Sequence, residues 1–81
     1  MPHFFFHTAD GKRNRDKEGV DLPDQGAARK EAIRFAGRVL DDEPDLLWDG
    51  RDFRVEVMNE SGALLFTVIA LAVNAPASEE V

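Results

Sequence analysis

Residues 53–69, which read FRVEVMNESGALLFTVI, decide the fold. Apolar and charged residues alternate through the first five positions, and this period of two is typical of a β-strand with one buried face. The polar run at residues 59–62 predicts a turn, in which Gly62 can supply the left-handed residue of a type I turn plus bulge. The apolar residues that follow predict a second strand, so the stretch is a β-hairpin.

The register of this hairpin decides which side chains share a face. The turn favours a register that pairs Val57 with Leu65, Val55 with Thr67 and Phe53 with Ile69. The other face then receives an unusually apolar set for a solvated surface, namely Met58, Leu64, Phe66, Val68 and Ala70. A register slipped by one residue would expose Leu65 and Ile69 instead.

Two more strands are expected at the amino-terminal end. Residues 3–8 are rich in aromatic side chains and precede the hairpin-type dipeptide Asp10-Gly11, which predicts a strand and a turn. Residues 15–22 would form the returning strand. Only Val20 and Leu22 are apolar in that segment, and its charged residues suit a solvated sheet edge.

A helix is expected after Pro23. Asp24 is a good N-cap, because its carboxylate can accept from the free amides of a first helical turn. From Gln25 to about Asp42 the apolar residues recur at helical spacing and form one stripe, made of Ala28, Ala32, Phe35, Ala36 and Val39. We expect this stripe to cover the sheet face that carries Phe53, Val55 and Val57.

The predicted order is therefore β-β-α-β-β, an α+β fold in which one helix packs on a mostly antiparallel four-stranded sheet as a two-layer sandwich. A chain of 81 residues has room for one core. We expect a single domain over residues 1–73 and a flexible tail over residues 74–81.

The chain resembles a family of short, uncharacterised bacterial proteins that is defined only as a domain of unknown function. The likeness is carried by short motifs along nearly the whole sequence: Pro2-His3-Phe4-Phe5-Phe6-His7, Asp10-Gly11, Glu18-Gly19, Leu22-Pro23-Asp24, Ala28 with Glu31-Ala32, residues 53–57 and Asn59-Glu60-Ser61-Gly62. These are mostly turn and core positions, so the resemblance implies a fold and no activity. A weaker likeness of fold is to the antitoxin partners of small bacterial RNase toxins, and fold alone does not deliver function.

Composition excludes several classes of function. The formal net charge of −6 opposes binding to nucleic acids and to anionic membranes. The basic residues Lys12, Arg13, Arg15 and Lys17 are interleaved with acidic ones that nearly cancel them. The chain lacks cysteine, no segment has the pattern of a signal peptide, and the longest apolar run is about half of the ~20 residues that span a bilayer. We expect a cytoplasmic protein that binds neither nucleic acid nor membrane.

Three groups of polar residues are candidates for a metal-binding or catalytic site. His3 and His7 are four residues apart on a strand, about 13 Å, which is too far for a shared metal ion. Asp16 and Glu18 share a strand face, but no apolar pocket is expected there to raise a pKa. The acidic residues Asp41, Asp42, Glu43, Asp45 and Asp49 lack the glycine and the regular ligand positions of a calcium loop.

Two functions remain open. The first is a non-enzymatic interaction module without a cofactor, either a homodimer or bound to another protein, whose interface is the outer sheet face at Phe5, Met58, Leu64, Phe66 and Val68. The second is a small ligand-binding or metal-binding subunit that uses His3, His7 and the acidic loop.

Overall fold

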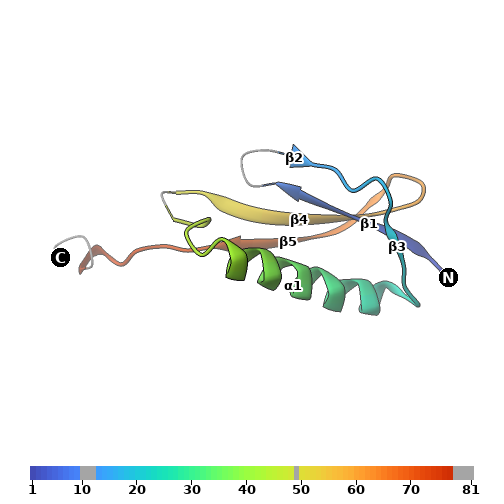
Figure 1. The fold of residues 1–81 in the computed structure, drawn as a ribbon, viewed down its shortest axis with the longest axis horizontal. Coiled ribbons are helices and arrows are strands. Elements are labelled where there is room, and N and C mark those ends of the chain that lie inside the picture. The colour runs from blue at the N-terminus through green and yellow to red at the C-terminus, as the bar shows by residue number, and fades with distance from the viewer. Residues whose placement is uncertain (10–12, 49, 78–81) are drawn as a thin grey trace.

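The computed structural model describes residues 1–9, 13–48 and 50–77, which form one sheet with one helix against it (Figure 1). The elements are β1 (His3–Ala9), β2 (Arg13–Asn14), β3 (Val20–Asp21), α1 (Gln25–Asp42), β4 (Asp52–Asn59) and β5 (Leu64–Leu71). β2 and β3 both pair with β1 at the same edge, so the sheet has the order β2/β3, β1, β4, β5, and all pairings are antiparallel. The predicted α+β class with one helix on a four-stranded antiparallel sheet is confirmed.

The second strand is interrupted, and its predicted extent over residues 15–22 is wrong. Two short segments pair with β1 instead, one where Asn14 lies opposite Thr8 and one where Val20 lies opposite Phe4. The five residues between them leave the sheet. The segment could not be recognised as broken from its polar pattern, because a solvated edge strand and a loop have the same composition.

The helix agrees closely with the prediction. The carboxylate of Asp24 accepts from the N–H of Ala27 at 2.8 Å, and the helix runs from Gln25 to Asp42. Alanines at every fourth position are buried against the sheet, and their small side chains let the helix lie close to it. Residues of the predicted stripe and of β4 form the core together with the amino-terminal phenylalanines: Phe4, Phe6, Ala28, Ala32, Ala36, Phe53, Val55 and Val57 are buried.

The register of the β4–β5 hairpin differs from the prediction by one residue. Val57 lies opposite Phe66 and Val55 opposite Val68, with an irregularity between Val57 and Met58. Residues directly opposite each other share a sheet face, so Phe66 and Val68 lie on the helix side, where both are partly buried against the core. The outer face receives Ile69 and not Val68.

Some expectations concern residues outside the described part of the chain, namely the Asp10-Gly11 turn, Asp49 in the acidic loop and residues 78–81 of the tail. The helix found in the described residues is not long and apolar enough to cross a membrane.

Candidate functional site

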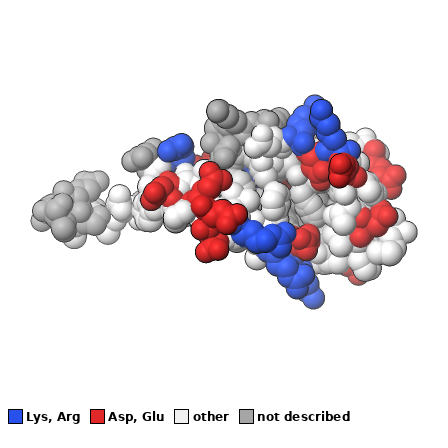
Figure 2. Space-filling view, in the orientation of Figure 1, with Lys and Arg blue, Asp and Glu red and all other residues white. Residues whose placement is uncertain are grey.

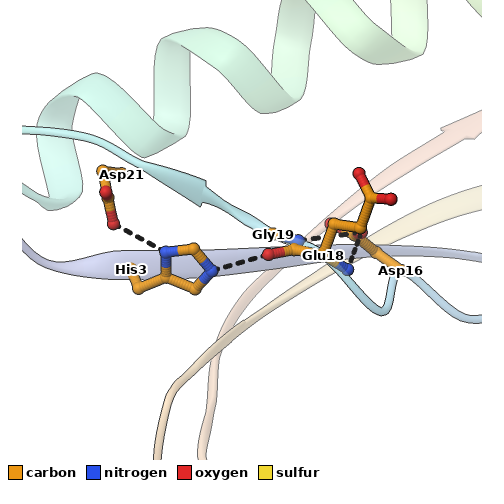
Figure 3. Close-up of polar contacts among 5 residues, drawn as sticks. All are labelled: His3, Asp16, Glu18, Gly19 and Asp21. Atoms are coloured by element: carbon orange, nitrogen blue, oxygen red, sulfur yellow. Dashed lines mark hydrogen bonds and ion pairs between the residues drawn. The ribbon is translucent and has the colours of Figure 1, made fainter.

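The main polar cluster of the described residues lies where the second strand is interrupted. There the side chain of Asp16 turns back toward β1 and takes the place of the missing strand. Its Oδ2 accepts from the backbone N–H of Phe6 at 3.1 Å. Its Oδ1 accepts from the N–H groups of Glu18 and Gly19 at 3.1 and 3.0 Å, as Figure 3 shows. One carboxylate thus satisfies backbone donors that a continuous edge strand would have satisfied.

His7 holds the same loop from the outer face of the sheet. Its Nδ1 accepts from the backbone N–H of Asp16 at 2.9 Å, so the neutral ring carries its proton on Nε2. Burial works to raise the pKa of the Asp16 carboxyl, but the N–H donors of Gly19, Phe6 and Glu18 outweigh it, and the pKa lies below its ordinary value. Asp16 is therefore a charged structural group, not a proton donor at neutral pH.

His3 bridges β1 to β3 with both ring nitrogens. Its Nδ1 lies 2.6 Å from Oδ1 of Asp21, and its Nε2 lies 2.7 Å from the carbonyl oxygen of Glu18 (Figure 3). Both neighbours are acceptors, so the arrangement is fully satisfied only when both nitrogens carry protons. The hydrogen bond to Asp21, followed by that to the Glu18 carbonyl, raises the pKa of His3 above its ordinary 6.5.

Gly19 makes this close approach possible. Its φ of 68° lies in the left-handed region that favours glycine. A Cβ at this position would come within 2.5 Å of Nε2 of His3 and 2.7 Å of the carbonyl oxygen of Phe4. A side chain here would displace both the histidine and the backbone of β1.

Three imidazole nitrogens of the histidines named in the metal-binding alternative have partners within the protein. Both nitrogens of His3 and the Nδ1 of His7 are already used within the protein, so a metal ion would have to break these bonds. In the described part of the chain, no three side chains of His, Asp or Glu are placed to hold a metal ion. The acidic residues predicted as a loop, Asp41, Asp42, Glu43 and Asp45, are exposed at the carboxyl end of α1, where Figure 2 shows acidic side chains gathered.

The predicted carboxylate pair is not brought together. Asp16 is saturated by backbone donors, whereas the side chain of Glu18 is exposed and contributes its backbone groups to the cluster.

Two shallow cavities flank the cluster. One of ≈ 450 Å³ lies between the β1 edge and α1, with Phe6, Val20 and Phe35 among its lining residues. The other, of ≈ 390 Å³, lies on the outer face beside Phe5 and Met58. Asp16 lines both, and it is already fully engaged. The lining of the first cavity also includes Thr8, Asn14, Arg15 and Glu31, of which Glu31 is paired with Arg38 at 3.1 Å.

The predicted interface residues are divided between two faces. Phe5 and Met58 are direct neighbours across β1 and β4 on the outer face, and Leu64 is exposed at the start of β5. Phe66 and Val68 belong to the helix side, and this part of the predicted patch is wrong. Ile69 and Leu71 are the exposed apolar residues of β5 in their place.

The structural role of Asp16 was missed by sequence reasoning, which treated it as one member of a carboxylate pair. A signal was present, because an aspartate followed by a glycine three residues later is typical of a loop in which the side chain accepts from nearby amides. That pattern favours a turn over a continuous strand.

Comparison with known proteins identifies the family of the chain. A family model described as Domain of unknown function (DUF6894) matches residues 3–72, and the chain belongs to this family. Comparison with curated proteins and with solved structures finds no match. The resemblance to an uncharacterised family is thereby confirmed.

Proposed function

We propose that this chain is a non-enzymatic interaction module that associates with a second copy of itself. The observation that carries the proposal is a set of large apolar side chains left exposed on β5 and beside it. Leu64 and Ile69 are each 53% exposed, Leu71 is 63% exposed, and Ile33 on the helix is 61% exposed. Large apolar side chains left exposed along one edge of a sheet are candidates for an interaction surface.

The polar groups support a role without catalysis. His3 and Asp16, whose pKa values are shifted, are both held by protein groups in a structural cluster, and no substrate is needed to explain the shifts. A group with a shifted pKa is a candidate for catalysis when it lines a cleft and no structural contact accounts for the shift.

The proposal also includes the kind of partner and the location of the protein. The net charge of −6 disfavours nucleic acid as a partner, and Figure 2 shows basic and acidic side chains lying beside one another on that face. A second copy of the chain is favoured over another protein because symmetric dimers are the commonest oligomers. We place the module in the bacterial cytoplasm, in keeping with a chain that lacks cysteine.

Sedimentation equilibrium tests the proposal directly. We expect the parent protein to have the mass of two chains at tens of micromolar (about 10–50 µM), a range in which modest dimers form. Replacing Ile69 with Lys would place a charge in the apolar group and should yield monomers. Val20→Lys is the matched control, because Val20 is an exposed apolar residue on the opposite edge of the sheet and should leave the dimer intact. A parent protein that stays monomeric would overturn the proposal.

A further inference from the structure

We infer that the second copy adds to the free edge of β5, so that two chains form one continuous antiparallel sheet with their α1 helices side by side on the same face. The inference rests on the self-association proposed above and names the surface and geometry of that association. Four features of the chain support it: the sequence of the edge, the direction of its backbone groups, the flank of the helix beside it and the polar interruption of the outer face.

From Phe66 to Leu71 the edge of β5 carries none of the features that usually prevent pairing, and the one irregularity of the strand lies before this segment, at Leu65, which has no register partner on β4. β5 reads LLFTVIAL over eight residues, without a charge, a proline or a glycine. Among the described elements, no strand pairs with its outer side. Proteins usually protect a free edge with lysine, proline or a bulge, and a long apolar edge without them is a template for another strand.

The direction of the backbone groups follows from the contact made by Asp16. The N–H of Phe6 points to Asp16 and hence away from β4, so Phe6 and Val57 form a pair without hydrogen bonds. The backbone groups of Val57, and of Val55 two residues earlier, therefore point to β5. Their partners Phe66 and Val68 bond to β4. Along β5, every second residue has the opposite direction. The N–H and C=O groups of Thr67, Ile69 and Leu71 therefore point outward, away from β4.

This alternation fixes how two copies can pair. Only the outward residues Thr67, Ile69 and Leu71 can exchange hydrogen bonds with a second chain, so each must lie opposite a residue of the same set. Their side chains all lie on the face away from α1, and directly opposed residues share a face. Both copies therefore place α1 on the same side of the joined sheet, as a two-fold axis perpendicular to the sheet requires.

The flank of the helix that faces this edge is apolar beyond Arg29, an exposed residue that lies on the same flank one turn before Ile33. Glu31 and Phe35 line the cavity beside β1, so this side of α1 faces the β1 edge. At 3.6 residues per turn, Ile33, Gly37 and Leu40 lie on the opposite flank, toward the free edge of β5. Ile33 is exposed, and a Cβ on Gly37 would have no neighbour within 4 Å. The exposed isoleucine and the open space at Gly37 leave room here for a second helix.

The spacing of the two helices agrees with ordinary helix packing. α1 contacts both β4 and β5, and in Figure 1 it lies nearest to β5 at its carboxyl end. With strands about 4.8 Å apart, a helix midway between β4 and β5 lies about 5 Å from the axis between the two copies of β5. The two helices are then about 10 Å apart, at the upper end of the usual range of 8–10 Å.

The outer sheet face is a poorer surface for the second copy. Phe5 and Met58 lie at one end of that face and Ile69 and Leu71 at the other. Between them, His7 lies opposite Glu56, which in turn lies opposite Thr67. A face-to-face dimer would bury this polar row, whereas an edge-paired dimer leaves it in solvent.

Replacement of Ile69 by proline or by alanine separates edge pairing from other modes of association. Ile69→Pro removes an outward N–H but no bond between β4 and β5, and proline is tolerated at such edge positions. We expect it to raise the dimer dissociation constant about a hundredfold, because the donor is lost from both copies. Ile69→Ala keeps the N–H and should change the constant less than about tenfold. Far-UV circular dichroism checks that both variants fold.

Amide hydrogen exchange on the parent protein tests the same inference without a mutation. The amides of Thr67, Ile69 and Leu71 should exchange fast in dilute monomer and become protected as the concentration rises, whereas the amide of Val68 is protected in both. A dimer in which these three amides remain unprotected, or in which Ile69→Pro associates like the parent, would overturn edge pairing and leave self-association standing. A monomeric parent would overturn both.

Discussion

His3 shows how much of the structure around the break in the second strand depends on single side chains. Its ring lies between the Asp21 carboxylate and the Glu18 carbonyl, and Gly19 supplies the space that lets the loop reach it. Asp16 holds the other side of the loop. Its carboxylate accepts from the backbone N–H of Phe6 on β1 and from those of Glu18 and Gly19 within the loop. Each of these residues can be tested separately.

The stability contributed by His3 should depend on pH. Its pKa is raised in the folded protein, so its contribution is complete below the unfolded value of 6.5 and is lost as the pH rises through the higher folded value. We expect His3→Gln to lower the melting temperature more at about pH 5.5 than at about pH 8.5. Thermal melting of both proteins across this range is the measurement. A melting difference that stays constant, or grows toward alkaline pH, would contradict the charged form of His3.

The carboxylate of Asp16 acts in a separate window of pH. Its pKa is lowered in the folded state, so its contribution is present above the unfolded value of 3.8 and is lost only as the pH falls through the lower folded value. The two titrations therefore do not overlap, and the comparison above reports on His3.

Gly19 can be compared with a second glycine of similar backbone conformation. Gly19 and Gly62 both have positive φ values, 68° and 84°, but only a Cβ on Gly19 would collide with a backbone atom. We expect Gly62→Ala to cost about 1 kcal/mol from backbone strain and Gly19→Ala about 3 kcal/mol or more. Urea unfolding of the two variants measures the difference. Equal costs would mean that the close approach to β1 has no energetic weight.

The elements of the fold differ in how far their sequences determine them. The start of the helix could be predicted to the residue and its end approximately, because Asp24 caps it and the apolar stripe has one clear period. β4 could be predicted equally well, since its alternation leaves one face for the core. β5 could not, because both of its faces are apolar and a shift by one residue leaves the pattern unchanged.

The position of β5 is fixed by features that lie outside its own pattern. Oδ1 of Asn59 accepts from both the N–H and the hydroxyl of Ser61 and from the N–H of Ala63, which shapes the turn. The irregularity beside Val57 then shifts the strand by one residue, and Phe66 and Val68 fill the space under the helix. The candidate site was likewise beyond the sequence pattern, because the contacts of Asp16 and His3 depend on where a loop of five residues returns.

The helix layer offers a test at this scale. Ala32 is fully buried between α1 and the sheet, so Ala32→Asp would place an unpaired charge in the core. We expect a loss of about 4 kcal/mol, or a melting temperature lowered by more than about 15 °C for a domain of this size. Lys30→Asp, on the exposed side of the same helix, should change it little. Thermal melting that does not distinguish the two variants would contradict the placement of the helix.

At the scale of the whole molecule, the two edges of the sheet are unlike each other. One is made of the short strands β2 and β3 with a loop between them, and the other is the unbroken strand β5. Charges are frequent near the first edge and absent from β5. Ile33, the exposed large apolar residue of the helix, lies on the flank toward β5, so the asymmetry extends to the helix layer.

The carboxylate of Asp16 has a further consequence for stoichiometry. A sheet in which both edge strands can pair with another chain can add copies at both edges and grow into a fibre. A sheet in which only one edge strand can pair has no free edge left once a single partner is bound. At the opposite edge, the Asp16 carboxylate occupies the amide of Phe6, and β2 and β3 pair with β1 on either side of it. In the dimer inferred above, the carboxylate that closes this gap within one chain would also leave fewer free backbone groups for a third subunit.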